Sequence, residues 1–464
     1  MKQDTIVALA SGSGRAGVAV IRVSGPQAGA ALRALTDADL PAPRRAERRV
    51  FRDAGGPIDD GLALWFPGPA SFTGEDVAEL HVHGGPAVIQ GVVEACLVQT
   101  GVRPAEPGEF TRRAFENGKL DLAEAEGLAD LVDAETEGQR RQALRQMQGE
   151  LSALYERWRA QLIEAMALLE AAIDFPDEDL PSDLERRVGP RVDAISADLA
   201  RHLNDAHRGE RVRDGYRIAI IGAPNAGKSS LLNALARREA AIVSDIPGTT
   251  RDVVEVRLVL GGYPVWIADT AGLREAADAI EAEGVRRALA RAEEADLRIG
   301  LVEAGRPPDP ALEAALRPGD LLLQSKADLA PSRSPDDGVA SDPGPMSSIG
   351  VARSNMGPGS RAVRDPGERR ISVRSGEGLA ELEAFLADRV QRDLADQEAP
   401  ALTRTRHRRL VEEALAALSR PRPDQAELWA EDLRLAAQAL GRLTGRIDVE
   451  DLLDEVFSSF CIGK

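Results

Sequence analysis

The chain has 464 residues, a formal net charge of −18 and two cysteines. This length predicts about three domains, each able to bury a core of its own. The negative charge argues against a global attraction to nucleic acid or to an anionic membrane, so contact with nucleic acid needs a local basic patch or a basic partner. Two cysteines argue against a disulfide framework, and no apolar run has the length of a membrane span. We therefore expect a soluble, cytoplasmic protein.

The first 117 residues or so have a mixed α/β pattern. Strands are predicted over residues 18–23, 61–66 and 77–83. These runs are apolar or alternating, and each ends at glycine or proline. In the third strand, alternation puts Glu79, His81 and His83 on one face. We favour a solvated strand face for them, because a metal site would need a fourth ligand at close spacing.

From about residue 120 the pattern becomes helical. Apolar residues recur at steps of three and four from Leu144 to Leu169, which predicts one long amphipathic helix ending near Ala172. A second helical segment is predicted over 181–211, and helices resume near Leu379 and continue to the C-terminus. Helical sequence on both sides of an α/β stretch predicts a helical domain with an α/β domain inserted in it.

Two segments do not fit this pattern. Residues 331–367 are crowded with proline, glycine, serine and aspartate and have no periodicity, and we favour disorder for a loop of this length. The other segment is a basic run that is a candidate nucleic-acid patch, although such a run is more often a solvated helix face. Its members are Arg404, Arg406, His407, Arg408 and Arg409.

The most specific motif is the loop Gly222-Ala223-Pro224-Asn225-Ala226-Gly227-Lys228-Ser229. A β-branched run precedes it and a helical run follows it, which is the context of a phosphate-binding loop. The glycines allow backbone N–H groups to surround an anion at the positive end of the helix. Lys228 is expected to reach the β- and γ-phosphates and Ser229 to ligate Mg²⁺. The motif therefore predicts a nucleotide site.

Four later stretches follow this loop in the order that a GTPase requires. They are residues 246–252, 265–272, 321–328 and 372–374. Thr250 offers a hydroxyl to Mg²⁺ and the γ-phosphate, and Asp269 is expected to hold Mg²⁺ through its water shell. Asp328 can accept hydrogen bonds from the ring N–H and the 2-amino group of guanine, and adenine has neither donor there. The base read at this site is therefore expected to be guanine.

Two residues depart from the usual GTPase pattern. Leu273 follows Gly272 at the position where Ras-type enzymes carry the glutamine that orients the attacking water. Leucine cannot bond to water, so the catalytic group must come from elsewhere, and the nearest candidates are Arg251, Arg274, Glu275 and Glu281. Ser325 replaces the asparagine of the guanine-reading Asn-Lys-x-Asp motif, and its hydroxyl is too short both to contact the base and to bridge to the phosphate loop.

The flanks of the GTPase motifs resemble one family. The stretches that carry the resemblance are Asp4–Ala8, Phe72–Asp76, His83–Pro86, Pro107–Thr111, Lys119–Ala123 and Phe460–Lys464. They are similar to the tRNA modification GTPase family, MnmE, also called TrmE, over nearly the whole chain except 331–367. The resemblance implies a multidomain fold of α/β and all-α parts. We expect an N-terminal α+β domain (1–118), a helical domain in two parts (119–212 and 381–464) and a Ras-like P-loop GTPase domain (213–380) inserted between those parts.

The resemblance also implies a function. It implies a homodimer held by the N-terminal domain, working with the FAD-dependent partner MnmG as a heterotetramer. Together they would add a carboxymethylaminomethyl or aminomethyl group to C5 of the wobble uridine of certain tRNAs. The one-carbon donor would be a folate, 5-formyl- or methylene-tetrahydrofolate. The alternative is a regulatory GTPase switch in ribosome assembly, which would need neither a folate-type domain nor the terminal Cys-Ile-Gly-Lys.

By motif position the resemblance assigns site residues. The folate residues would be Arg22, Glu79, Lys119 and Lys464. The K⁺ ligands would be Asn225 and carbonyls of Ser244, Ile246 and Thr249, and the catalytic residues would be Glu281, Arg251 and Cys461. The expected GTP-binding residues are Asn225, Ala226, Gly227, Lys228, Ser229, Ser230, Ser244, Asp245, Ile246, Pro247, Gly248, Thr249, Thr250, Asp269, Thr270, Ala271, Gly272, Ser325, Lys326, Asp328, Ser372, Val373 and Arg374.

Overall fold

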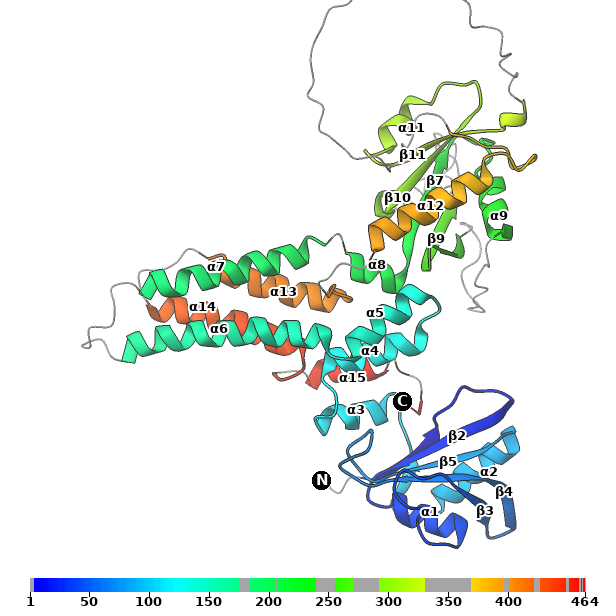
Figure 1. Cartoon of the computed structure of the whole chain (residues 1–464), viewed down its shortest axis with the longest axis vertical. Coiled ribbons are helices and arrows are strands. Elements are labelled where there is room, and N and C mark those ends of the chain that lie inside the picture. Colours follow the sequence, from blue (N-terminus) through cyan, green and yellow to red (C-terminus); the bar gives the residue numbers. More distant parts are fainter. Residues whose placement is uncertain are drawn as a thin grey trace, which may run out of the picture. The chain divides into compact units, whose positions relative to one another are not determined.

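The computed structural model of the chain forms two compact units (Figure 1). The first comprises residues 1–134, 139–209 and 398–464, and the second comprises residues 135–138 and 210–397. The structure describes residues 4–174, 184–205, 207–238, 255–269, 292–329, 369–395, 400–420, 426–447, 450–458, 460, 462 and 463. Among the helices described there, none has the length and apolar character needed to cross a membrane.

A six-stranded sheet organises the N-terminal part of the first unit. Its order is β3-β4-β5-β2-β1-β6, and all neighbours are antiparallel except β1 and β6. The strands are β1 (Thr5–Leu9), β2 (Ala16–Ser24), β3 (Glu47–Asp53), β4 (Gly56–Phe66), β5 (Val77–Gly84) and β6 (Val102–Pro104). The predicted strands at 18–23, 61–66 and 77–83 are confirmed as parts of β2, β4 and β5.

Helices α1 (Ala28–Thr36) and α2 (Pro86–Leu97) cover one face of this sheet. The alternation of the strands explains which side chains face them: in β5, Leu80 and Val82 join the core, while Glu79 and His81 are half-buried on the other face. Apolar side chains from both helices complete the core on the covered face. The polar face of β5 lies on the side of the sheet opposite α1 and α2.

Two short helices lead from the sheet to the helical part. They are α3 (Glu109–Glu116) and α4 (Leu122–Asp133). The start of α4 is fixed by a capping box, in which Asp121 accepts from the backbone N–H of Glu124 and Glu124 accepts from that of Asp121, each at 2.8 Å. Next comes α5 (Glu137–Met147), followed after a break by α6 (Glu150–Asp174).

That break corrects the prediction of one helix running from Leu144 to Ala172. Gly149 has a φ of +87°, in the left-handed region that suits glycine, and it ends α5 before α6 begins. Leu144 therefore belongs to α5 rather than to the long helix. The predicted helical segment at 181–211 is likewise divided, into α7 (Leu184–Leu203) and α8 (Arg208–Asp214).

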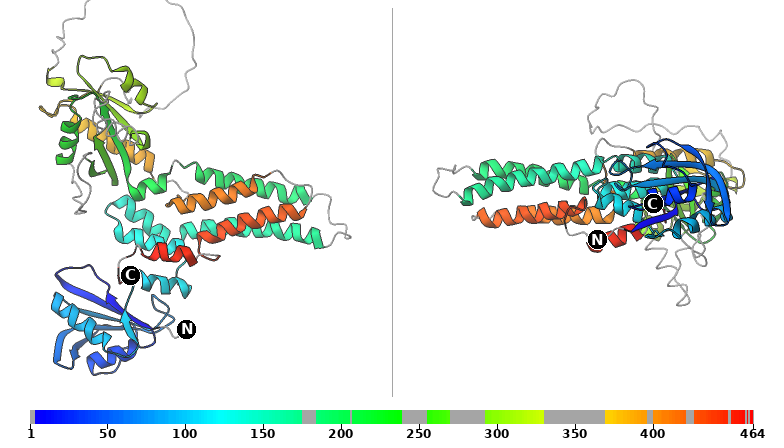
Figure 2. Two further views of the ribbon diagram at one scale, coloured as in Figure 1. Left: turned by 180° about the vertical axis from the view of Figure 1, so that it is seen from behind. Right: turned by 90° about the horizontal axis from the view of Figure 1, so that it is seen from below.

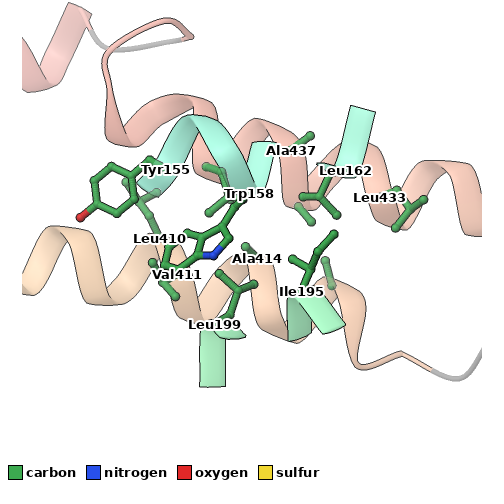
Figure 3. Close-up of a cluster of buried hydrophobic side chains, with 14 of the residues drawn as sticks. Tyr155, Trp158, Leu162, Ile195, Leu199, Leu410, Val411, Ala414, Leu433 and Ala437 are labelled. Atoms are coloured by element: carbon green, nitrogen blue, oxygen red, sulfur yellow. The ribbon is translucent and has the colours of Figure 1, made fainter. Parts of the chain in front are cut away.

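Four long helices lie side by side in the helical part of the first unit (Figures 1 and 2). They are α6, α7, α13 (Thr405–Leu418) and α14 (Ala426–Leu443), and a short α15 (Glu450–Ser458) follows. Side chains from all four meet around the fully buried Trp158 (Figure 3). Segments separated by the whole inserted unit thus share one core, as the insertion predicted from the sequence requires.

The basic run at the start of α13 corrects another expectation. His407 is 0% exposed and Arg408 is 7% exposed, so this part of the run is neither a solvated face nor a free nucleic-acid patch. Arg406 donates to both carboxylate oxygens of the buried Glu126, at 3.2 and 3.0 Å. Arg404 bonds to Asp130 at 2.6 Å. The positive charges of Arg404 and Arg406 are therefore paired with carboxylates inside the fold.

The second unit is a doubly covered sheet of order β12-β11-β10-β7-β9-β8, in which only β8 and β9 are antiparallel. Its strands are β7 (Tyr216–Gly222), β8 (Glu255–Leu260), β9 (Tyr263–Asp269), β10 (Leu297–Glu303), β11 (Leu321–Ser325) and β12 (Arg369–Arg370). Its helices include α9 (Lys228–Arg238), α11 (Pro310–Ala315), α12 (Leu379–Leu394) and the 3₁₀ turn η1 (Ala327–Leu329). Because β7 is central, the loop after it opens at the carboxyl edge of the parallel strands.

Helix α12 belongs to this second unit. Its Leu382, Leu386 and Val390 are at most 1% exposed and join the same core as the strands. The sequence predicted that the inserted domain ends near residue 380, which would have assigned most of α12 to the helical domain. The physical reason for the difference is that the apolar stripe of α12 resembles those of the helical domain, and periodicity does not identify the surface on which a helix packs.

Candidate functional site: a phosphate loop and an ion-paired cavity

The backbone conformation of the loop after β7 restricts which residues can occupy several of its positions. A Cβ on Gly222 would lie 2.5 Å from the carbonyl oxygen of Leu301, so this position accepts no larger residue without movement of the backbone. Gly227 has a φ of +97° and Asn225 a φ of +62°, both in the left-handed region. Helix α9 begins directly at Lys228. Backbone N–H groups and the helix N-terminus therefore face the space where a phosphate would lie.

Lys228 lies folded onto this loop. Its Nζ donates to the carbonyl oxygens of Gly222 and Ala223, both at 3.0 Å. The residue is 6% exposed. Burial lowers the pKa of Lys228, although the charge of Asp269 acts in the opposite direction. An anionic phosphate in the loop would give this ammonium group the counter-charge that the loop carbonyls supply only in part.

Ser229 and Asp269 come together as the sequence predicts for a magnesium site. The hydroxyl of Ser229 donates to Oδ2 of Asp269, at the end of β9. The other carboxylate oxygen of Asp269, Oδ1, is buried and has no hydrogen-bond partner in the part of the chain that the structure describes. A hydroxyl and a carboxylate oxygen are ligands suited to Mg²⁺, and the unpartnered oxygen fits an added cation or its water shell.

The base-reading end is formed by the ends of β11 and β12. Asp328 is exposed, and its Oδ1 accepts a 2.7 Å hydrogen bond from the hydroxyl of the buried Ser372. Lys326 has a φ of +54° and its Nζ lies 3.4 Å from a carboxylate oxygen of Glu303. Val373 and Arg374 follow as exposed residues. The structure thus brings the 321–328 and 372–374 stretches together, with one carboxylate oriented and accessible.

Ser325 makes contacts that the sequence alone did not specify. Its Oγ donates to the carbonyl oxygen of Ala226 at 2.6 Å and lies 3.2 Å from that of Val302. The residue is 4% exposed. The hydroxyl therefore ties β11 to the phosphate loop.

Several predicted site residues lie outside the residues that the structure describes. They are Ser244, Asp245, Ile246, Pro247, Gly248, Thr249, Thr250, Arg251, Thr270, Ala271, Gly272, Arg274, Glu275, Glu281, Cys461 and Lys464. The segment 331–367 also lies outside them.

A second candidate site lies on the face of the N-terminal sheet opposite α1 and α2. Arg22 on β2 donates from Nε and Nη2 to Oε1 of Glu79 on β5, at 3.0 and 2.9 Å. Glu79 and Lys119 line the same cavity of about 510 Å³, together with Phe66 and Phe72. The geometry joins three of the four residues implied for folate binding. A carboxylate held by an arginine beside aromatic rings can accept N–H groups of a flat heterocycle.

Other residues of this cavity were not identified from the sequence. Arg44 lines it, with its guanidinium 5.8 Å from the ring centre of Phe66. Arg22 also lies 5.4 Å from the ring centre of Phe72. The Nε2 atom of His81 is buried, 3.6 Å from Oε2 of Glu79, and has no hydrogen bond within the described residues. The alternation that put His81 beside Glu79 was the available signal, whereas nothing in the sequence marked Arg44.

Two of the resembling stretches, 72–76 and 107–111, are joined by ion pairs of Arg113. Arg113, 6% exposed, bonds to Glu75 at 3.1 Å and to Glu109 at 2.9 Å. Arg103 bonds to Glu109 at 2.6 Å. Burial opposes ionisation of Glu109, but hydrogen bonds from Arg103, the Glu106 backbone and Arg113 lower its pKa below the usual value. Residues 72–76 and 107–111 therefore have a structural role, as a charged support for the loop around the cavity.

The described part of the C-terminal tail contacts the N-terminal sheet. Ile462 forms a β-bridge with Pro107. Gly463 has a φ of +99°, and a Cβ there would lie 2.0 Å from the carbonyl oxygen of Leu9. The tail thus lies against the end of β1, the strand that pairs with β2 and therefore with Arg22.

Two family models together span nearly the whole chain. The model of the MnmE helical domain matches residues 122–461, and that of the GTP-binding protein TrmE N-terminus matches residues 5–119. The tRNA modification GTPase MnmE of Maricaulis maris is 57% identical over 466 residues, covering 99% of each chain. That of Parvibaculum lavamentivorans is 56% identical over 468 residues, covering 99% of this chain and 100% of the relative. The chain belongs to the MnmE family. The predicted family, fold class and classification as a GTPase are confirmed.

Solved structures similar to this MnmE-family chain are distant. Aquifex aeolicus Era Y63A bound to GDP·AlF4⁻ is 20% identical with a TM-score of 0.25, covering 45% of this chain and 68% of that one. The G domain of the T. maritima FeoB iron transporter is 20% identical with a TM-score of 0.23, covering 37% of this chain and 98% of that one. Scores this low add nothing to the sheet order and loop geometry given above.

Proposed function

We propose that this chain couples GTP hydrolysis to modification of tRNA. In this proposal it acts with the FAD-dependent MnmG and adds a carboxymethylaminomethyl or aminomethyl group to C5 of the wobble uridine, with a folate one-carbon unit as donor. The observation that carries the proposal is the ion pair of Arg22 and Glu79 in a cavity of about 510 Å³, in a chain that also has a phosphate loop. A switch in ribosome assembly, the alternative, needs the loop but has no use for this cavity.

At the nucleotide, Lys228 would bind the β- and γ-phosphates, and Ser229 would bind Mg²⁺ together with Thr250. Asp269 would hold the water shell of the ion; its unpartnered Oδ1 supports that role. Asp328 would accept the two guanine donors. When bound, Mg²⁺ neutralises charge that develops on the phosphates.

Hydrolysis itself needs a group that orients water, because Leu273 cannot do so. We assign this role to Glu281. Arg251, in the stretch 246–252 that is expected at the γ-phosphate, is the second candidate for a catalytic group. A K⁺ ion held by Asn225 and by carbonyls of Ser244, Ile246 and Thr249 would supply positive charge where transition-state charge develops.

At the folate cavity, Glu79 would accept N–H groups of the folate ring, while Arg22 holds its carboxylate in place. Lys119 and Lys464 would bind the folate from the cavity rim and from the tail, and Cys461 would take part in the one-carbon step. The contact of the tail with β1 supports a role for it near the sheet. The same proposal includes a homodimer, a heterotetramer with MnmG and a cytoplasmic location.

Mass spectrometry of wobble uridine tests this function. tRNA from a deletion strain is expected to lack the modification, and the wild-type gene is expected to restore it. Glu79→Gln and Cys461→Ser are expected to leave GTP hydrolysis in place and to fail in restoring the modification. Full modification in the deletion strain, with accumulation of ribosomal precursors, would establish the switch instead.

A further inference from the structure

Ser325 occupies the first position of the guanine-reading motif, and it is almost completely covered at 4% exposure. A serine hydroxyl has one proton to donate. That proton lies between two protein carbonyls, those of Ala226 at 2.6 Å and Val302 at 3.2 Å. Both acceptors belong to the fold and are present whether or not a nucleotide is bound. The hydroxyl therefore has no second proton to offer a base.

Guanine presents different groups on its two edges. Its Watson–Crick edge carries two donors, the ring N–H and the 2-amino group, which suit the accessible carboxylate of Asp328. Its other edge carries two acceptors, O6 and N7, and can be read only by a donor. An asparagine amide has two N–H donors, so one could bond Ala226 and the other the base. Ser325 has lost that second donor while keeping the bond to the phosphate loop.

We propose that Ser325 acts in this chain only as a positioning residue for the phosphate loop, so that N7 of guanine is not read and guanine is selected from its Watson–Crick edge. The inference rests on the assignment of this site to guanine nucleotides. It predicts an unusual specificity: nucleotides altered at position 7 are accepted, whereas those altered at the 2-amino group are rejected.

Calorimetric affinities of the full chain for three nucleotides test the proposal. GDP and 7-deazaguanosine diphosphate, in which N7 is replaced by C–H, are expected to bind equally within about twofold. Inosine diphosphate, which lacks the 2-amino group, is expected to bind about tenfold or more weakly, because it loses a hydrogen bond to a charged acceptor. Weaker binding of the 7-deaza nucleotide by the wild-type chain would overturn the proposal, whatever any variant does. No binding of GDP at all would instead overturn the assignment of the site.

Two variants separate positioning from reading. Ser325→Asn is expected to raise the affinity for GDP by about twofold to tenfold, because it restores one neutral hydrogen bond to N7. The affinity for the 7-deaza nucleotide, which has no N7 acceptor, is expected not to rise. Ser325→Ala is expected to weaken both nucleotides by the same factor, since only the tie to Ala226 is lost. Ser419→Ala removes a comparable hydroxyl bond, to the carbonyl oxygen of Leu415 on α13, and is the matched control for stability. A Ser325→Ala variant that changes the ratio of the two affinities would contradict a positioning role.

Discussion

Glu126 and His407, 281 residues apart in sequence, share a 2.7 Å hydrogen bond inside the helical part of the first unit. Glu126 is 1% exposed and His407 is 0% exposed. Burial by itself raises the pKa of Glu126, but His407, Arg406 and Arg404 lower it well below its usual range. One carboxylate on α4 thus holds the first turn of α13, where the chain returns from the inserted unit.

Glu126→Gln is expected to destabilise the helical part strongly. The change keeps the shape of the side chain but leaves the half-buried Arg406 and the buried His407 without their carboxylate, and breaking a buried ion pair from one side costs about 3–5 kcal/mol. Urea unfolding followed by far-UV circular dichroism measures the loss. Glu412→Gln, on the same α13 at an exposed position, is the matched control and is expected to change stability by less than about 0.5 kcal/mol. Equal stability of both variants would show that the network contributes nothing.

The same pair predicts how stability depends on pH. The pKa of Glu126 is lowered in the folded state, so its contribution is present above the ordinary glutamate value and is lost as pH falls through the folded one. Burial lowers the pKa of His407, although Glu126 opposes that shift, so below about pH 6.5 the unfolded chain binds a proton that the folded chain resists. Both effects lower the free energy of unfolding on acidification. We expect the urea midpoint to fall below about pH 6.5, where the unfolded His407 takes up a proton, and to fall further below about pH 4.5, where the contribution of Glu126 is lost. In Glu126→Gln the second fall should be absent, while the first should be at least as large because His407 has lost the carboxylate that favours its charged form.

Much of this fold was predictable because its signals are local. Strands β2, β4 and β5 of the N-terminal sheet, the phosphate loop and the helical flanks each follow from periodicity and turn residues within a few positions. The pairing of Arg406 and His407 with Glu126 was not predictable, because Glu126 is distant in sequence and a basic run has the same composition whether it is solvated or paired. The break at Gly149 was missed for a related reason: an apolar stripe continues across it, while the backbone conformation that ends the helix leaves little trace in hydrophobicity.

The candidate sites show the same division. The order of the GTPase stretches indicated that Ser229, Asp269 and Asp328 act at one site, since the carboxyl ends of parallel strands meet at one edge. By contrast, the partners of Ser325 depend on how closely β11 approaches the loop after β7, which no spacing in the sequence specifies. The same is true of Arg44, whose place beside Phe66 depends on the packing of a loop.

Glu281→Ala is expected to lower kcat for GTP hydrolysis by about 10²-fold or more, while GTP affinity stays near normal. The reason is that Leu273 cannot orient water and a positioned acid or base supplies that scale of rate. Rates are measured in K⁺ and in Na⁺, and K⁺ is expected to be the better activator. Glu275→Ala is the comparison variant among the nearby acids. Equal rates in the two salts, or an unaffected Glu281→Ala, would refute the assignment.

Gly463→Ala is expected to displace the tail from the N-terminal sheet. The added Cβ would lie 2.0 Å from the carbonyl oxygen of Leu9, and the φ of +99° disfavours alanine as well. If the tail serves the folate cavity, modification of wobble uridine falls while GTP hydrolysis is retained. Gly305→Ala, which also has a positive φ of +84° but meets nothing within 4 Å, is the control for backbone strain alone. Unchanged modification in Gly463→Ala would remove the tail from the mechanism.

Glu79→Gln is expected to weaken folate binding by about tenfold or more and to leave the fold intact. Glu79 is half-buried, its Oε1 is held by Arg22, and its Oε2 faces His81 at 3.6 Å. The amide keeps the shape but replaces an acceptor by a donor and removes the charge that holds Arg22, so N–H groups of a pterin ring lose a charged partner. The measurement is calorimetric titration of the full chain with 5-formyltetrahydrofolate. Glu94→Gln on α2, which exchanges an exposed carboxylate bonded to Gln90, is the matched control and should bind normally. Retained affinity in Glu79→Gln, with thermal unfolding unchanged, would mean that the cavity binds another ligand or that folate binds elsewhere.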